Sequence, residues 1–227
     1  MAEDKKEDKK MAEASVLNRQ TERTDPSADQ DNAKRRQIVE GARQIFMAQG
    51  FDAASMNEIA RAAGVSKGTL YVYFQNKEQL FEAIVGHECR EQGERIFALD
   101  PEEHDIEGVL MRLGLAFVEF LCRPARAPKL RTVIAIAERM PDLGRRFYET
   151  GPAFGLGQLT TYLNAQVAAG ILAIDDCEIA AAQFLDSCVA TLFKPILFNC
   201  GEVPTPERMA HVVNIAVRTF LAAYRVR

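Results

Sequence analysis

The chain of 227 residues lacks any run of eighteen apolar residues, so its sequence predicts no membrane span. Its N-terminus is charged and has no apolar core, which argues against a secretory signal. The cysteines are odd in number and scattered along the chain, and they lack the close spacing that is typical of metal-binding sites. We therefore expect reduced thiols in a cytoplasmic protein, at Cys89, Cys122, Cys177, Cys188 and Cys200.

The sequence also shows no nucleophile–base set, no metal triad and no glycine-rich phosphate loop, so we expect no enzyme, no metal and no cofactor. The C-terminal half has no strand-like alternation and no hairpin turn. Its apolar residues recur instead at helical spacing. These absences predict an all-α fold.

Charge is distributed unevenly along the chain, although the net charge is only −4. Residues 1–32 carry six Lys/Arg against nine Asp/Glu, whereas residues 33–80 carry seven against four. Residues 81–227 carry fifteen against nineteen. A basic segment within an acidic chain indicates a local nucleic-acid contact rather than a wholly basic binder.

The stretch from Ser55 to Lys77 reads as two short helices joined by a tight turn. Ser55 and Glu58 have the spacing of a capping box, which starts a helix. Gly64 comes where that helix must stop, since glycine readily takes the left-handed conformation that ends helices. Ser66 can cap the next helix, whose first turn is where a recognition helix presents side chains to a major groove.

Within this stretch, the pattern IAxxAGVSxGTLYxYFxxKEQL strongly resembles the DNA-binding segment of TetR-type transcriptional regulators. The resemblance covers residues 34–80, and residues 140–196 are more weakly similar to the C-terminal domain of the AefR-like branch. It implies an N-terminal three-helix helix-turn-helix domain at residues 33–80. A larger helical domain for ligand sensing and dimerisation follows at 81–227. A small helical hairpin with ordinary turn chemistry is the alternative.

Related regulators use the matched positions for DNA contact, and we carry that role over residue by residue. Lys67 is a long donor suited to guanine or phosphate, and Lys77 would grip a phosphate beside a helix N-terminus. Either lysine alone could simply be solvated. Leu70 and Phe74 are expected in the core. The predicted DNA-binding residues are Ser55, Ser66, Lys67, Gly68, Thr69, Tyr71, Tyr73 and Lys77.

Residues 1–32 are rich in charge and poor in large apolar side chains, which predicts disorder. An arm along DNA is an alternative, but its net acidity argues against one, except near residues 34–36. Helices are then expected at residues 33–49, 76–99, 105–122, 130–139, 140–170, 175–199 and 206–224. Breaks are expected at Pro124 and Pro128, an interruption at residues 151–152 and a bend at Pro195.

The last two helices, at about 175–199 and 206–224, have more apolar surface than one partner layer needs. They could be buried within one subunit, but reading a palindrome favours a homodimer. A sensor cavity is expected in the same domain. Its predicted lining, which could equally be ordinary core, is Phe117, Phe120, Leu121, Ile134, Phe147, Phe154, Tyr162, Phe184 and Cys188.

The predicted function is a transcriptional repressor that binds a double-stranded palindromic operator as a homodimer and associates with the nucleoid when bound. A small apolar or amphipathic molecule would release it. The alternative is a ligand-independent TetR-like regulator acting as an activator or through protein partners. A redox switch at Cys122 or Cys188 is a further, minor option.

Overall fold

In the computed structural model, the described part of the chain is residues 26–226, without the side chains of residues 26–29, 85 and 87–89. This part is helical, and its only pairing of extended backbone is a single antiparallel bridge between Leu172 and Arg225. The expectation of an all-α fold is confirmed. Within residues 26–226, no helix is both long and apolar enough to cross a membrane.

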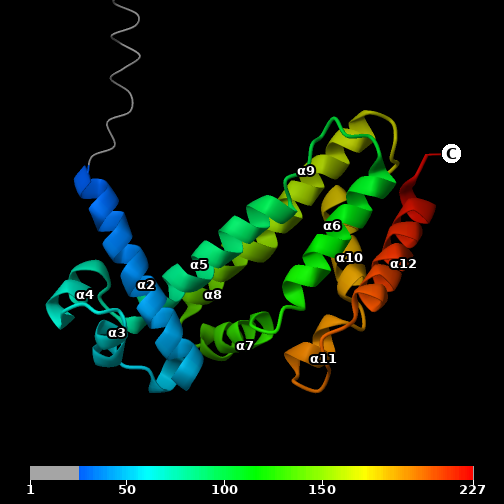
Figure 1. Cartoon of the computed structure of the whole chain (residues 1–227). Helices are drawn as coiled ribbons and strands as arrows, with labels where there is room; N and C mark the ends of the chain where they lie inside the picture. The colour runs from blue at the N-terminus through cyan, green and yellow to red at the C-terminus, as the bar shows by residue number, and fades with distance from the viewer. Residues whose placement is uncertain (1–25, 227) are drawn as a thin grey trace, which may run out of the picture.

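The helices follow one another as shown in Figure 1. The N-terminal unit and the connecting helix are α2 (Pro26–Ala53), α3 (Met56–Ala62), α4 (Lys67–Tyr73) and α5 (Lys77–Ile96). The rest of the chain forms α6 (Ile106–Leu121), α7 (Arg126–Ala137), α8 (Pro141–Tyr148), the π-helical turn η1 (Glu149–Ala153), α9 (Phe154–Ala168), α10 (Cys177–Val189), α11 (Phe193–Leu197) and α12 (Pro206–Tyr224).

Helices α2, α3 and α4 surround a small core of their own, to which the start of α5 contributes. Its fully buried side chains are Ile38, Ile59, Leu70 and Leu80. Gly41 allows α2 to lie close against the end of α3, because a Cβ added there would be 2.6 Å from the Ala63 backbone. The N-terminal unit therefore has a packed core that can hold α4 at its surface.

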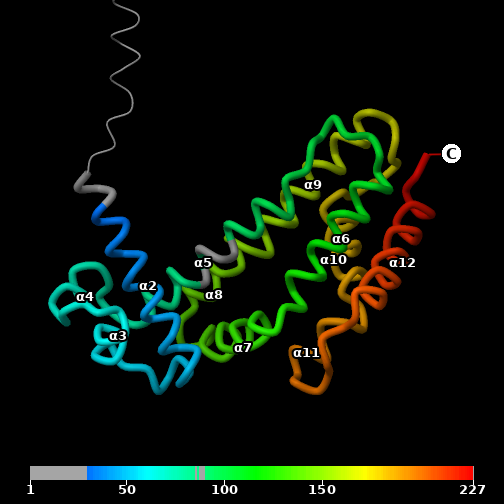
Figure 2. Tube along the Cα trace, in the orientation of Figure 1, coloured from blue at the N-terminus to red at the C-terminus, as the bar shows by residue number. Residues whose placement is uncertain are grey.

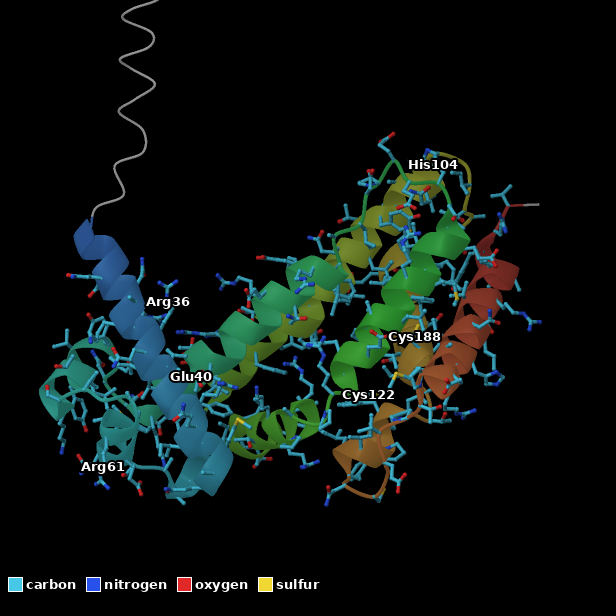
Figure 3. All side chains as sticks on the ribbon, viewed as in Figure 1. Arg36, Glu40, Arg61, His104, Cys122 and Cys188 are labelled. Carbon is cyan, nitrogen blue, oxygen red and sulfur yellow. The ribbon has the colours of Figure 1, made fainter. Side chains whose placement is uncertain are left out.

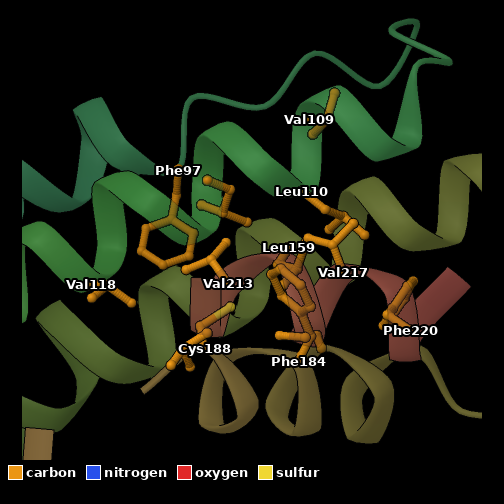
Figure 4. Close-up of a cluster of buried hydrophobic side chains, with 14 of the residues drawn as sticks. Phe97, Val109, Leu110, Val118, Leu159, Phe184, Cys188, Val213, Val217 and Phe220 are labelled. Carbon is orange, nitrogen blue, oxygen red and sulfur yellow. The ribbon is translucent and has the colours of Figure 1, made fainter. Parts of the chain in front are cut away.

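The larger domain packs α6, α9, α10 and α12 around a second core, of which Figure 4 shows the centre. Phe184 of α10 meets Phe220 of α12 edge-on, with ring centroids 5.6 Å apart. Gly114 of α6 makes the close packing possible, since a Cβ there would lie 2.6 Å from Val213 and 3.1 Å from the Cys188 sulfur. In Figure 2 the chain traces of α6, α10 and α12 lie at one end of the molecule, away from α4.

A third apolar cluster joins the two domains. Phe51 and Phe81 of the N-terminal side pack with Val133 of α7 and Leu143 of α8. The rings of Phe51 and Phe81 are 5.2 Å apart, and Phe46 completes an aromatic triplet with them. This joint links the N-terminal unit to α7 and α8.

The structure corrects the expected N-terminal boundary. Residues 26–32, predicted to be disordered, form the first turns of α2, while residues 1–25 lie outside the described residues. The helix also runs past Gln49 to Ala53, with a kink at Gly50, whose φ of 79° and ψ of 172° are not helical. Glycine tolerates that conformation without a steric penalty.

Three other boundaries differ from expectation. Pro128 does not break a helix, because it lies in the first turn of α7, where proline is tolerated. The helix expected from residue 175 begins at Cys177, and Asp176 caps it by accepting from the Ile179 N–H. The helix expected to reach residue 199 ends at Val189, and Thr191 has a left-handed φ of 63° before α11 begins. The predictions for α6 and α12, by contrast, are confirmed within one residue.

Candidate DNA-binding site and comparison with known proteins

The site is built on a helix–turn–helix formed by α3 and α4. The Ser55–Glu58 capping box is present, and the hydroxyl of Ser55 lowers the pKa of the Glu58 carboxyl by donating to it. Gly64 ends the helix with a φ of 63°, as its position predicts. Gln37 of α2 donates to the Ala63 carbonyl at 2.7 Å and so ties the turn to α2.

Helix α4 presents one exposed face to solvent. Leu70 and Phe74 point into the core, as predicted, so the opposite face of the helix must be turned to solvent. Lys67, Gly68 and Tyr71 lie on that outward face, with the Lys67 ammonium 6.0 Å from the centre of the Tyr71 ring. Three of the predicted DNA-binding residues are thus together on one accessible helix surface.

Val72 belongs to the same face, although the sequence analysis did not select it. Its side chain is 81% exposed, beside the exposed Tyr71. The signal was available in the sequence. Leu70 and Phe74 are one helical turn apart and both buried, so a residue midway between them must face outward. An apolar, β-branched side chain here adds a surface that can meet a thymine methyl group.

The hydroxyls of Ser66 and Thr69 have local partners. Ser66 caps α4 by accepting from the Thr69 N–H at 3.0 Å, and the two hydroxyl oxygens are 2.7 Å apart. Ser55 likewise donates to Glu58 at 2.6 Å. These residues set the helix starts, and a direct contact with phosphate stays a prediction for each of them.

Tyr73 lies at the flank of α4 and is tied to α2. Its hydroxyl donates to Asp31 at 2.5 Å, and this hydrogen bond to a carboxylate raises the pKa of Tyr73. Asp31 lies in the part of α2 that was expected to be disordered, so sequence reasoning could not anticipate this contact. To donate to a phosphate, the Tyr73 hydroxyl must first give up its hydrogen bond to Asp31.

Lys77 has a different position from the one expected. Its ammonium group donates to the carbonyls of Phe51 and Asp52 at 2.9 Å each and to that of Ala54 at 3.3 Å. It also lies 4.8 Å from the centre of the Phe51 ring. Lys77 therefore caps the C-terminal end of α2, where cations are favoured by the helix dipole, instead of pointing away from the protein.

Further cations lie on α2 and α3. Arg61 of α3 and Arg36 of α2 are exposed, as Figure 3 shows. Arg35 stacks over the ring of Phe74 at 5.1 Å. With the net charge of +3 over residues 33–80, these side chains give the unit a positive field suited to a phosphate backbone.

The nine residues predicted to line a sensor cavity lie in different surroundings. Tyr162, Phe184 and Cys188 are fully buried in the main core, and Tyr162 donates to the Glu103 carbonyl at 2.8 Å. Ile134 is 56% exposed on α7. The other five, all partly buried, are Phe117, Phe120, Leu121, Phe147 and Phe154.

Open grooves lie elsewhere. One of about 640 Å³ runs between α2, α5 and α8, and of the nine predicted residues it includes Phe147 alone. A second, of about 330 Å³, lies between α5 and α6. Apolar side chains such as Leu99 and Leu113 line it together with Arg95, Arg112 and Arg123. The charge in this groove was not anticipated from the sequence.

Burial raises the pKa of the Cys188 thiol to about 12 and also raises the pKa of Cys122. Neither sulfur is therefore a thiolate at neutral pH, which disfavours the redox switch. Within the described residues there is no group of three metal-binding side chains.

Comparisons with known proteins agree with this architecture. Residues 38–84 match the family of bacterial regulatory proteins of the tetR type, and residues 108–226 match the C-terminal domain of the AefR-like transcriptional repressors. The second match alone covers more than half of the chain. The chain belongs to the TetR family of transcriptional regulators. Its relatives are DNA-binding regulators and not enzymes.

Among similar sequences, the HTH-type transcriptional repressor Rv1474c of Mycobacterium tuberculosis is 33% identical over 195 residues, covering 84% of this chain and 95% of the relative. The regulator UidR of Escherichia coli is 28% identical, covering 66% of this chain and 85% of UidR.

Solved structures give the same result. A TetR-family regulator from Mesorhizobium loti superposes with a TM-score of 0.79 at 29% identity, covering 86% of this chain and 98% of the other. The flavonoid-responsive regulator FrrA gives 0.74 at 32% identity, covering 86% and 99%. The expected membership of the family, including the AefR-like branch, is confirmed.

Proposed function

We propose that this TetR-family protein is a repressor that binds a palindromic operator as a homodimer and is released by a small molecule. The observation that carries the proposal is the outward face of α4, formed by Lys67, Gly68, Tyr71 and Val72. This face offers the Lys67 cation, the Tyr71 phenol and the apolar Val72 side chain to a major groove. Gly68 has no side chain, so the helix backbone can come close to the DNA there. Thr69 and Tyr73 flank it.

The other predicted DNA-binding residues act less directly. Ser55 and Ser66 act by placing the starts of α3 and α4, whose backbone N–H groups can face phosphates. Lys77 supports the site by holding the end of α2, and its contact with phosphate would require it to leave three carbonyls. Arg36 and Arg61 are the exposed cations that we add to the phosphate-contacting set.

A homodimer is supported by the outer surfaces of α10 and α12. Ile179 and Ile215 are exposed there, although both helices already bury an inner face. In a homodimer, a two-fold axis relates the two N-terminal DNA-binding units, which we call the heads. Two heads can read half-sites one helical turn apart, roughly 34–36 Å. A single head would make few phosphate contacts and bind weakly at physiological salt.

For the ligand, the groove between α5 and α6 favours an amphipathic molecule with an acidic group. Arg112 is paired with Glu103 at 2.6 Å. Arg95 and Arg123 outnumber the remaining carboxylate of the groove, Glu119, so an anion beside the apolar surface would meet a net positive charge. The similarity to FrrA, named flavonoid-responsive, supports control by a small molecule. Because α5 leads directly from the head, a ligand beside it can shift the equilibrium between DNA-bound and free conformations.

The function is tested by fluorescence anisotropy with DNA from upstream of the protein's own gene, across a salt series. Saturable binding of two subunits per site, with log K falling steeply against log salt, is expected. A medium-chain fatty acid and the matching alcohol then test release, since they share the apolar chain and differ in charge. If a random-sequence selection with refolded protein enriches no site, the repressor proposal is wrong.

A further inference from the structure

Phe198, which directly follows α11, is 76% exposed, more than any other large apolar side chain described beyond α4. A single exposed apolar residue is ordinary in a soluble protein and has no meaning alone. What distinguishes Phe198 is that the backbone which carries the ring is held in a braced turn.

The backbone on either side of the ring is fully engaged in a tight turn. The N–H of Phe198 donates to the Lys194 carbonyl, and that of Asn199 donates to the Ile196 carbonyl, both at 3.0 Å. Asn199 has a left-handed φ of 57°, a conformation that is uncommon for a residue other than glycine. Such a conformation persists where the surrounding structure fixes it.

A brace from α7 and a close contact within the loop support this turn. Arg131 of α7 donates to the carbonyls of Ile196 and Leu197 at 3.2 and 3.0 Å, which satisfies the end of α11. Gly201 folds back so tightly that a Cβ there would lie 2.6 Å from Pro195. The ring of Phe198 thus extends from a braced backbone, so binding need not pay for ordering this loop.

The position of the turn indicates which partner it meets. It lies at the end of the α10–α12 layer next to α7, on the side toward the DNA-binding unit (Figure 1). Val203, in the same loop, is also exposed, as are Ile179 on α10 and Ile215 on α12. Phe198 and Val203 therefore add exposed apolar side chains at the α11 end of the layer to those that α10 and α12 present.

Charges on that surface fit a second copy of this chain. The outward residues of α10 include the acidic Glu178 and Asp186, whereas those of α12 include Arg208 and Arg218 beside a single acidic residue, Glu207. A two-fold rotation that places α10 of one subunit against α12 of the other brings opposite charges together.

We propose that Phe198 is an anchor of the homodimer, buried against the second copy at the end of the bundle nearest the DNA. The inference rests on the proposed dimer and adds to it a specific contact outside α10 and α12. Both heads must reach the same DNA, so the two-fold axis brings equal ends of the two subunits together. The ring then meets the corresponding turn region of the partner, and this contact helps to fix the separation of the heads.

The chain contains no tryptophan, so Phe198→Trp gives a single fluorophore at the site. On concentrating the protein through its dimerisation range, the emission of this variant is expected to shift to the blue as the ring becomes buried. Tyr148→Trp, at an exposed aromatic on α8, is the matched control and should show no such shift. Analytical ultracentrifugation of the same samples measures the dimer directly.

In a second series, Phe198→Ser is expected to raise the dimer dissociation constant about tenfold or more, as for a central interface aromatic. Phe198→Leu should retain most of the affinity, and Tyr148→Ser should leave it unchanged. An unaltered thermal melt would confirm that Phe198→Ser folds.

If the wild type dimerises but the tryptophan stays solvent-exposed and Phe198→Ser dimerises normally, Phe198 is not an anchor and the proposed dimer stands. If the wild type remains monomeric at every concentration and on operator DNA, both proposals fail.

Discussion

Replacing Val72 by alanine separates DNA recognition from stability. The side chain is 81% exposed in the free protein, so truncation removes few contacts within the chain. Alanine also has the higher helix propensity, by roughly half a kcal/mol. The thermal melt of Val72→Ala should therefore equal or slightly exceed that of the wild type.

On DNA the same change should cost affinity. Val→Ala removes two methyl groups, each contributing about 0.8 kcal/mol when fully buried. If a groove wall covers about half of that surface, the loss is about 0.8 kcal/mol per subunit and about 1.6 kcal/mol per dimer. The operator dissociation constant should then rise about 15-fold.

The assay is anisotropy on the selected operator and on versions in which each thymine is replaced by deoxyuridine, which lacks only the methyl group. At the contacted position, Val72→Ala and the deoxyuridine should not be additive, because both remove the same contact. Ile134→Ala, an exposed β-branched residue on α7, is the control. Equal operator affinity of Val72→Ala and wild type, or additive losses at every thymine, would refute the assignment.

Other consequences concern residues around the site and in the core. Lys77→Met should lower the free energy of unfolding by about 2 kcal/mol, because three carbonyls lose a charged donor. An unchanged thermal melt together with weakened DNA binding would instead favour the original prediction that Lys77 contacts a phosphate. Asp31→Asn should raise operator affinity several-fold by removing a negative charge and releasing the Tyr73 hydroxyl, and weaker binding in anisotropy would show that Asp31 positions Tyr73 instead. Cys122 and Cys188, with pKa values raised by burial, should resist iodoacetamide in the native protein below pH 9 or so, and rapid native labelling by peptide mapping would contradict their burial.

The DNA-binding segment was predictable because its signals are local. The Ser55–Glu58 spacing, Gly64 and Ser66 each act within four residues, and each adopts the expected conformation. Helical phase likewise placed Leu70 in the core. Val72 follows from the same phase, so its omission was an error of selection rather than a limit of the sequence.

Contacts between distant residues were not predictable in this way. Lys77 meets carbonyls 23 to 26 positions earlier in the chain, and Tyr73 meets Asp31 across 42 positions. No local pattern marks Thr191 for a left-handed conformation, so the break between α10 and α11 was missed. Such features depend on how complete helices pack.

The sensor cavity shows a different limit. Helical phase reports that Tyr162, Phe184 and Cys188 are buried, and they are. It does not distinguish a residue that lines a cavity from one that fills the core, because both lie on the inner face of a helix. The charged groove between α5 and α6 depends on where two helices diverge, and this requires the tertiary structure.

The distribution of packing indicates where a conformational change can occur. Around Gly114 the main core leaves no room for even one added carbon, so α6, α10 and α12 move as one body. The joint between the domains is held differently. Beside its apolar cluster lie the ion pairs Arg139–Asp52 and Arg146–Glu82. Both arginines are exposed to solvent, which screens their attraction to the carboxylates, so these pairs add little to the stability of the joint. We therefore expect the proposed ligand at α5 to tilt the N-terminal unit against α7 more readily than it deforms the bundle. Because α7 also braces α11 through Arg131, such a tilt would reach the proposed dimer contact.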